Sequence, residues 1–164
     1  YPIEKALRAY DLMKDQHVPC LIYQDRYNMF CREMEKRHFE LCRELGMGFI
    51  AFSPLAQGIL TDKYLNGIPA NSRISKGVGF LKQSDITPDK LRIIEALNNI
   101  ALERGQTLAE MAIAWILKNK AVTSVIIGAS SVPQIDDNLR AIEKTCFTDP
   151  ELAIIDSILT GESV

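Results

Sequence analysis

Three short stretches of the chain are apolar at nearly every position, namely 20–23, 48–52 and 124–127. Continuous apolar runs of this length are typical of strands that are covered on both faces of a sheet. Elsewhere the apolar residues recur at the spacing of helices, over 3–15, 32–45, 88–104, 107–119, 134–144 and 150–159. Strands that alternate with helices predict βα units and a parallel sheet, and therefore an α/β fold.

The starts of the later helices carry capping signals. Thr87 precedes a proline at the first helical position, and the pairs Thr107/Glu110 and Thr148/Glu151 have the spacing of a capping box. Three strands make a sheet too small to cover its own edges, and the chain opens directly into a helix. The sequence therefore predicts one part of a larger barrel or sheet.

In the segment 64–87 the apolar residues follow neither the strand pattern nor the helix spacing, and the segment contains several glycines and cations. Unstructured segments longer than about 15 residues are uncommon inside compact domains and are often lids or binding loops. The alternative is a solvated surface excursion.

Composition narrows the class of protein. Apolar residues make up 47% of the chain and the net charge is −2, so a sizeable core is expected. Cations are interspersed with acids rather than grouped, which argues against a nucleic-acid binder. No apolar stretch approaches the roughly 20 residues of a membrane span. The four cysteines form no CxxC pair and the two histidines are not clustered, so we expect a soluble cytoplasmic protein with free thiols and no metal site.

Polar or glycine-rich residues follow each predicted strand: QDRYN at 24–28, SPLAQG at 53–58 and GASS at 128–131. Ligands of parallel α/β folds bind at the carboxyl ends of the strands. The three endings therefore predict one face that holds an elongated polar ligand.

The ending GASS has the chemistry of a phosphate site. Gly128 lets the backbone approach a ligand, Ser130 and Ser131 offer hydroxyls, and the next helix presents N–H groups and a favourable dipole. The alternative is that Ser131 only caps the helix. Residues 134, 137 and 138 lie near one another on this helix, where a solvated face is the alternative to a binding role.

Together, QDRYN, AFSPLAQGILTDKY, GIPANSR and IIGASSVPQIDDN resemble the later half of the aldo-keto reductases, over the whole chain and in the family's order. The similarity is to the branch that contains potassium-channel β subunits and bacterial L-glyceraldehyde 3-phosphate reductase-like proteins. This resemblance implies a (β/α)8 TIM barrel, of which the chain supplies about the sixth to eighth strands, and NADP(H) bound across the carboxyl ends.

The resemblance also implies a role for each site residue. Phe52 would stack on the nicotinamide ring, and Gln24 would bond its carboxamide. The remaining residues would hold the pyrophosphate (Ser53, Leu55, Gly58 and Lys63), close over the adenosine end (Arg73), and bind the adenosine and its 2′-phosphate (Gly128, Ser130, Ser131, Gln134, Asp137 and Asn138). Core packing is the alternative role for Phe52, and ordinary surface charge is the alternative for Lys63 and Arg73.

Two departures from the family pattern matter. Many members have basic residues where this chain has Gly128 and Gln134, so a preference for NADPH depends on Lys63, Arg73 and the helix N-terminus. The family's catalytic Asp, Tyr, Lys and His belong to earlier strands, and no tyrosine here matches the catalytic one. We therefore assign no catalytic residue to the chain.

The resulting hypothesis is the cofactor-binding part of an NADPH-dependent reductase of small aldehydes or ketones, with a homo-oligomer as a possible assembly. A cofactor-sensing regulatory subunit and a non-catalytic half-barrel are the alternatives.

Overall fold

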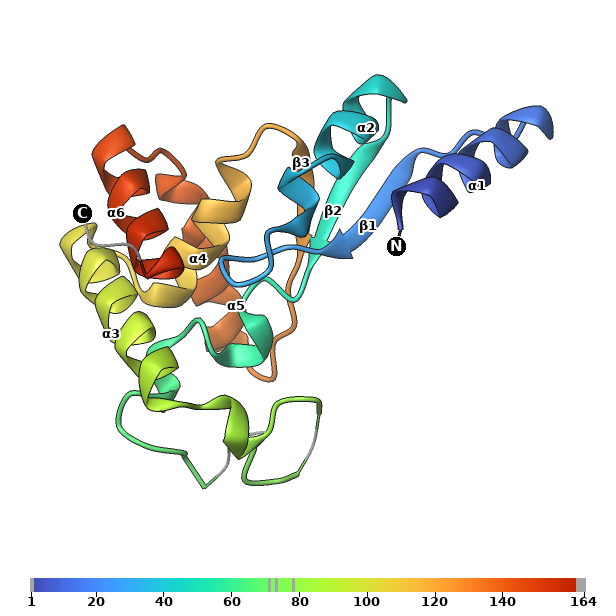
Figure 1. Ribbon diagram of the computed structural model, residues 1–164. Coiled ribbons are helices and arrows are strands. Elements are labelled where there is room, and N and C mark those ends of the chain that lie inside the picture. The colour runs from blue at the N-terminus through green and yellow to red at the C-terminus, as the bar shows by residue number, and fades with distance from the viewer. Residues whose placement is uncertain (1, 71, 73, 78, 162–164) are drawn as a thin grey trace.

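A computed structural model describes residues 2–70, 72, 74–77 and 79–161. Its centre is a parallel sheet in the order β1-β2-β3, formed by Ile22–Arg26, Gly48–Phe52 and Val122–Ile126 (Figure 1). The helices are α1 (Ile3–Asp15), α2 (His38–Glu44), α3 (Pro88–Glu103), α4 (Leu108–Leu117), α5 (Val132–Leu139) and α6 (Asp149–Thr160). Short 3-10 turns complete the list: η1 (Glu33–Glu35), η2 (Ala56–Gly58), η3 (Asp62–Tyr64), η4 (Gln83–Asp85) and η5 (Arg140–Lys144).

The predicted α/β class and the order of the elements are confirmed, with local differences. The helix expected over 134–144 is α5 followed by η5, and β3 begins two residues before its apolar run. The helix expected over 32–45 is broken into η1 and α2. β1 begins two residues later than its apolar run and continues to Arg26, so Gln24 lies inside the strand. The reason is backbone pairing, because the ladder to β2 runs without interruption from Ile22/Gly48 to Arg26/Phe52.

The sheet is covered on one face only, so the expectation of cover on both faces is wrong for the described chain. Phe49 and Ala51 of β2 are fully buried beneath α2 and α4, which contact β2 and β3 respectively. On the other face, Ile22 and Ile126 are 55% and 45% exposed. We call this second surface the open face.

Aromatic rings fill the core under the covered face. Tyr27 packs edge-on against Phe39, with ring centroids 4.9 Å apart, and lies 5.5 Å from Trp115. Phe39 in turn meets Phe49 edge-on at 4.8 Å. Edge-to-face contacts of this kind stabilise beyond the area they bury. The aromatic cluster thereby holds β1 and β2 against the helices that cover this face.

The register of β3 shifts by one residue next to β2, because Phe49 pairs with Val122 while Ile50 pairs with Ser124. Thr123 is left unpaired, and its hydroxyl accepts a hydrogen bond from the N–H of Phe49 at 3.2 Å. A Cβ at Gly48 would lie 2.9 Å from that hydroxyl, so a larger residue at this position would force the Thr123 side chain to move.

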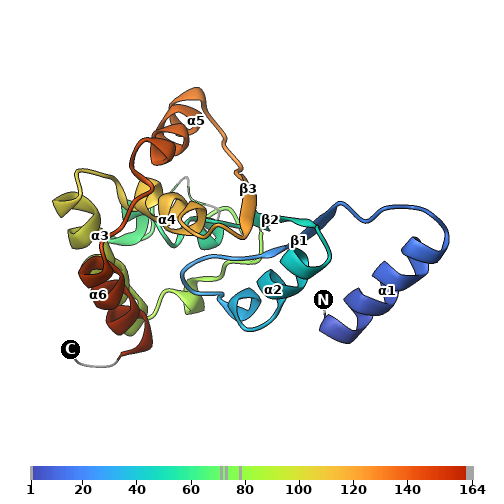
Figure 2. The ribbon, with the colours of Figure 1, turned by 90° about the horizontal axis from the view of Figure 1, so that it is seen from above.

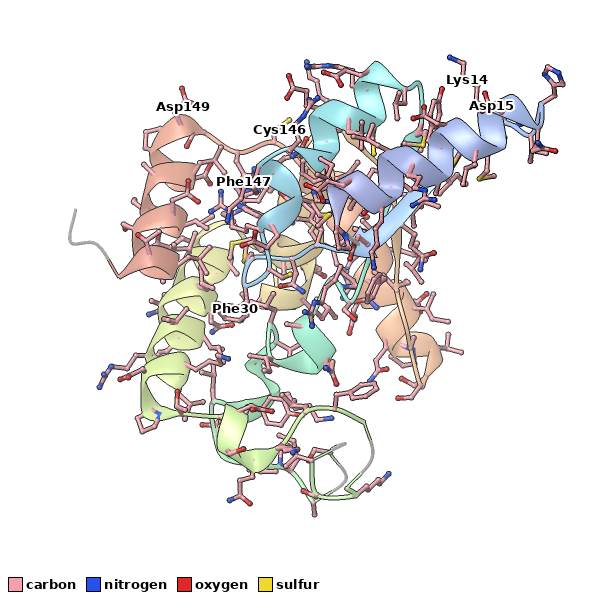
Figure 3. All side chains as sticks on the ribbon, turned by 45° about the vertical axis from the view of Figure 1, so that its right-hand side comes forward. Lys14, Asp15, Phe30, Cys146, Phe147 and Asp149 are labelled. Carbon is pink, nitrogen blue, oxygen red and sulfur yellow. The ribbon has the colours of Figure 1, made fainter. Side chains whose placement is uncertain are left out.

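Helix α6 is fastened to α3 by the buried side chain of Arg104, which is 5% exposed. Its guanidinium donates to Glu151 on α6 at 2.6 Å, to Gln106 at 2.9 Å, and to the carbonyl of Cys146 at 3.0 Å. It also lies 3.7 Å from the ring centroid of Phe147, which sits on the segment leading into α6 (Figure 3). One side chain thus joins three parts of the chain.

The capping signals are confirmed. Thr87 accepts from the N–H of Lys90, and Thr107/Glu110 and Thr148/Glu151 form complete capping boxes. Helix α1, in contrast, projects away from the rest of the chain and has no buried residue (Figures 1 and 2). None of the helices in the described ranges combines the length and hydropathy needed to cross a bilayer.

Candidate functional site

The carboxyl ends of the three strands meet at one edge of the sheet. Arg26 pairs with Phe52, and Phe52 pairs with Ile126, so each strand ends at the same level. The motifs that follow the strands therefore start side by side, as expected for a parallel sheet.

The open face presents Gln24 and Phe52 near this edge. Gln24 pairs with Ile50, and Phe52 follows Ile50 by two residues, so both side chains lie on the same face of the sheet. Gln24 is exposed and Phe52 is partly buried. An amide and one side of an aromatic ring are consequently available to a flat, polar ligand.

The turn that follows β2 has an uncommon backbone. Ser53, Ala56 and Gln57 have φ values of 54°, 46° and 62°, in the left-handed region that side chains other than glycine rarely adopt. Such conformations cost about 1–3 kcal/mol each and concentrate at ligand clamps and active sites. The turn is closed by hydrogen bonds from the N–H groups of Gly58 and Leu60 to the carbonyl of Leu55.

Asn28 holds the start of this turn and is a site residue that the sequence analysis did not single out. It is 2% exposed, and its Nδ2 donates to the carbonyl of Ser53 at 2.8 Å. Its Oδ1 accepts from the N–H of Phe30 at 3.0 Å. The available signal was an amide residue in the motif QDRYN, directly after a strand, where side chains often bond neighbouring backbone.

Gln57 connects the turn to the segment 64–87. Its Oε1 accepts a hydrogen bond from the N–H of Phe80 at 3.2 Å. In the described residues, no helix or strand lies between Leu65 and Lys82. This hydrogen bond therefore fastens a segment that has little regular structure of its own.

Replacing Gln57 by alanine should loosen that segment without unfolding the protein. Loss of one partly exposed neutral hydrogen bond of about 0.5–1.5 kcal/mol raises the open population about 2- to 10-fold. Limited digestion with trypsin at Lys82 should accelerate by that factor. The control is Gln57→Glu, which keeps both an acceptor and the side-chain length; equal cleavage of all three proteins would contradict the role of Gln57.

The third strand ends in an open loop before α5. Gly128, Ser130 and Ser131 are exposed, and an added Cβ at Gly128 would meet no atom within 4 Å. Ser131 occupies the N-cap position but its side chain makes no capping hydrogen bond. Instead, Oε1 of Gln134 accepts from both the N–H and the hydroxyl of Ser130, at 2.8 and 3.1 Å. The loop is shaped by Gln134, and the simple capping role considered for Ser131 is not found.

The other predicted residues of α5 have different surroundings. The Asp137 carboxylate bonds to Arg140, which also donates to Glu110 at 2.9 Å. Asn138 is 7% exposed, so the face is not uniformly solvated. Lys63 is exposed on η3. Arg73 lies outside the described residues.

Two tyrosines near β1 are poorly suited to donate a proton. Tyr27 is fully buried and donates its hydroxyl to Glu35 at 2.7 Å; burial, with the neighbouring carboxylate, raises its pKa far above the usual value. Burial, together with Asp25, raises the pKa of Tyr23 to about 12. A general acid works best with a pKa near the working pH, which neither group has.

A separate depression of about 650 Å³ lies near the amino ends of β2 and β3, between α2 and residues 118–121. It is at the opposite end of the sheet from Phe52. In the described part of the chain, no three His, Cys, Asp or Glu side chains gather in a way that could hold a metal ion.

The sequence of the chain is similar to that of known proteins. Residues 1–160 match the family model "Aldo/keto reductase family". The chain is 41% identical over 167 residues to an L-glyceraldehyde 3-phosphate reductase of Escherichia coli (strain K12), covering 99% of this chain and 48% of that protein. It is 38% identical over 141 residues to a "Probable voltage-gated potassium channel subunit beta" of Oryza sativa subsp. japonica, covering 84% of this chain and 42% of that protein.

The chain thus spans about half the length of the curated relatives it matches. Its three parallel strands and their helices are consistent with one part of the (β/α)8 barrel that the family implies. The match to the family model covers nearly the whole chain, and the chain belongs to the aldo/keto reductase family.

Proposed function

We propose that this chain is the cofactor-binding part of an NADP(H)-dependent oxidoreductase that reduces small aldehydes or ketones to alcohols. The observation that carries the proposal is the pairing of Arg26, Phe52 and Ile126 at one level, which puts Gln24, Phe52 and the left-handed turn at one edge.

The described residues fit such a cofactor. Phe52 is only partly buried, so its ring can stack on the nicotinamide while Gln24 orients the carboxamide. The turn residues Ser53 and Leu55, with Lys63, suit a pyrophosphate, because they combine backbone N–H groups with a cation. Gly58 contributes by closing the turn, since its N–H donates to the Leu55 carbonyl. Gly128, Ser130 and Ser131 leave open space for the adenosine end, where Gln134, Asp137 and Asn138 follow on α5.

When bound, the reduced nicotinamide supplies the hydride for the carbonyl carbon. The residues of this chain bind and orient: Phe52 fixes the plane of the ring, and Asn28 holds the backbone of Ser53 in place. The proton for the carbonyl oxygen comes, in this proposal, from a part of the barrel that precedes this chain.

The preference for NADPH over NADH is part of the proposal and depends on cations. Arg140 neutralises Asp137, which reduces the repulsion between that carboxylate and a 2′-phosphate. Lys63 and Arg73 supply positive charge. We further propose a cytoplasmic location and a homo-oligomeric assembly, by analogy with the family alone.

Turnover of a small aldehyde with NADPH by the complete protein tests the proposal. Lys63→Ala should weaken NADPH binding about 10-fold, as expected from the loss of one charged hydrogen bond, with a smaller effect on kcat. Lys14→Ala is the matched control, because Lys14 lies at the far end of α1 (Figure 3). Unchanged affinity in Lys63→Ala, or no oxidation of NADPH by any aldehyde or ketone, would contradict the proposal.

A second candidate is a cofactor-sensing regulatory subunit, supported by the similarity to proteins named as channel β subunits. A sensor binds NADPH tightly but turns it over poorly. The same titration and turnover measurements therefore separate the two functions.

A further inference from the structure

Arg26 is a cation at the site to which neither the family resemblance nor the proposed cofactor contacts assign a role. It is the last residue of β1, it is exposed, and it pairs with Phe52 across the sheet. Partners in a parallel pair lie on the same face, and adjacent strands are about 4.8 Å apart. The Arg26 side chain therefore starts next to the Phe52 ring, on the open face.

Charge pairing sets Arg26 apart from most other arginines. Ion pairs to carboxylates hold Arg32, Arg37, Arg43, Arg92, Arg104 and Arg140. Within the ranges that the structure describes, no carboxylate lies at ion-pair distance from the Arg26 guanidinium. The adjacent Asp25 points to the covered face, where the hydroxyl of Tyr23 donates to it at 3.4 Å.

The position of this cation relative to Phe52 limits what it can bind. In the proposed function, the reacting carbonyl lies against a nicotinamide that covers the Phe52 ring. Because Arg26 pairs with Phe52 and is exposed, its guanidinium can approach a small ligand that is held against that ring. A guanidinium in this position is suited to a carboxylate or phosphate at the far end of a short aldehyde, because its fork pairs with two oxygens at once.

We propose that Arg26 binds the anionic group of the substrate, and that the enzyme therefore prefers short aldehydes carrying a phosphate or carboxylate over their neutral counterparts. The inference rests on the proposed function, because it needs the carbonyl to lie at Phe52.

The test compares matched substrates in the complete protein and in Arg26→Ala. The pairs are glyceraldehyde 3-phosphate with glyceraldehyde, and succinic semialdehyde with butanal. For at least one pair, kcat/KM for the anionic member should fall about 10- to 100-fold in Arg26→Ala, as expected for a lost hydrogen bond to a charged group, while the neutral member changes less than about 3-fold. The pair that responds identifies the anion as phosphate or carboxylate.

Two further variants make the result specific. Arg26→Lys keeps the charge but not the fork, and should restore part of the lost kcat/KM. Arg43→Ala removes an equal charge from α2, near the opposite end of the sheet, and should leave both pairs unchanged.

Three outcomes would overturn the inference. Equal losses for anionic and neutral substrates would show that Arg26 acts on the fold or on the hydride step. A higher Kd for NADPH in Arg26→Ala, measured by fluorescence, would show that Arg26 binds the cofactor. Failure of the unsubstituted protein to reduce any of the four aldehydes, or related ketones, would remove the proposed function and this inference with it.

Discussion

Replacing Arg104 by alanine should lower the free energy of unfolding by about 3–5 kcal/mol, the range for breaking a buried ion pair by removing one partner. The variant loses the bond to Glu151 and leaves the carbonyl of Cys146 without its donor, while the carbonyl of Lys144 keeps only the 3.4 Å hydrogen bond from Nε2 of Gln106. Glu151 is 28% exposed and recovers some water, which favours the lower half of the range. Urea unfolding, with the midpoint compared at constant m-value, measures the change.

Arg92→Ala is the matched control for this result. Arg92 lies on α3, forms an ion pair with Asp89, and is 75% exposed. Its removal should cost less than about 1 kcal/mol, because exposed pairs contribute little. If Arg104→Ala cost no more than Arg92→Ala, the buried network would not be what holds α6 against α3.

The second large effect concerns the cofactor. Phe52→Ala should raise the Kd for NADPH about 5- to 100-fold, because stacking of a base on an aromatic ring contributes about 1–3 kcal/mol. Phe52→Tyr keeps the ring and should bind normally. Fluorescence titration of the complete protein with NADPH provides the measurement.

Ile22→Ala separates stacking from a general loss of apolar surface. Ile22 lies on the same open face as Phe52, at the other end of β1, and is 55% exposed. Its truncation should leave the Kd unchanged. A normal Kd in Phe52→Ala, or the same increase in both variants, would assign Phe52 to packing and remove the stacking role.

The sequence analysis predicted those features that depend on local chemistry. Thr107 and Glu110 identified a helix start because a capping box is a short-range arrangement. The three strand ends could be placed together because parallel topology aligns carboxyl ends. The sequence could not show that the open face is exposed, because apolar residues such as Ile22 and Ile126 look the same whether or not another layer covers them.

Contacts between residues that are far apart in the sequence also could not be predicted from it. Asn28 bonds to Ser53 across 25 residues, and Gln57 bonds to Phe80 across 23. Neither pair has a spacing that indicates contact. The left-handed φ values of Ala56 and Gln57 were hidden for a related reason, since glycine is the residue that normally marks such a conformation.

The isolation of α1 has a consequence for how the molecule loses structure. No side chain of its 13 residues is fully buried and Tyr10 packs only partly against the core, so α1 gains little from packing, and helices of that length are marginal when isolated. Its backbone amides should exchange with solvent deuterium through local fraying that is independent of global unfolding. The amides of α4, whose side chains are nearly all buried, should exchange only when the whole core opens. These two helices of the chain should therefore differ widely in hydrogen-exchange protection, with α1 near the lower limit and α4 near the limit set by global unfolding.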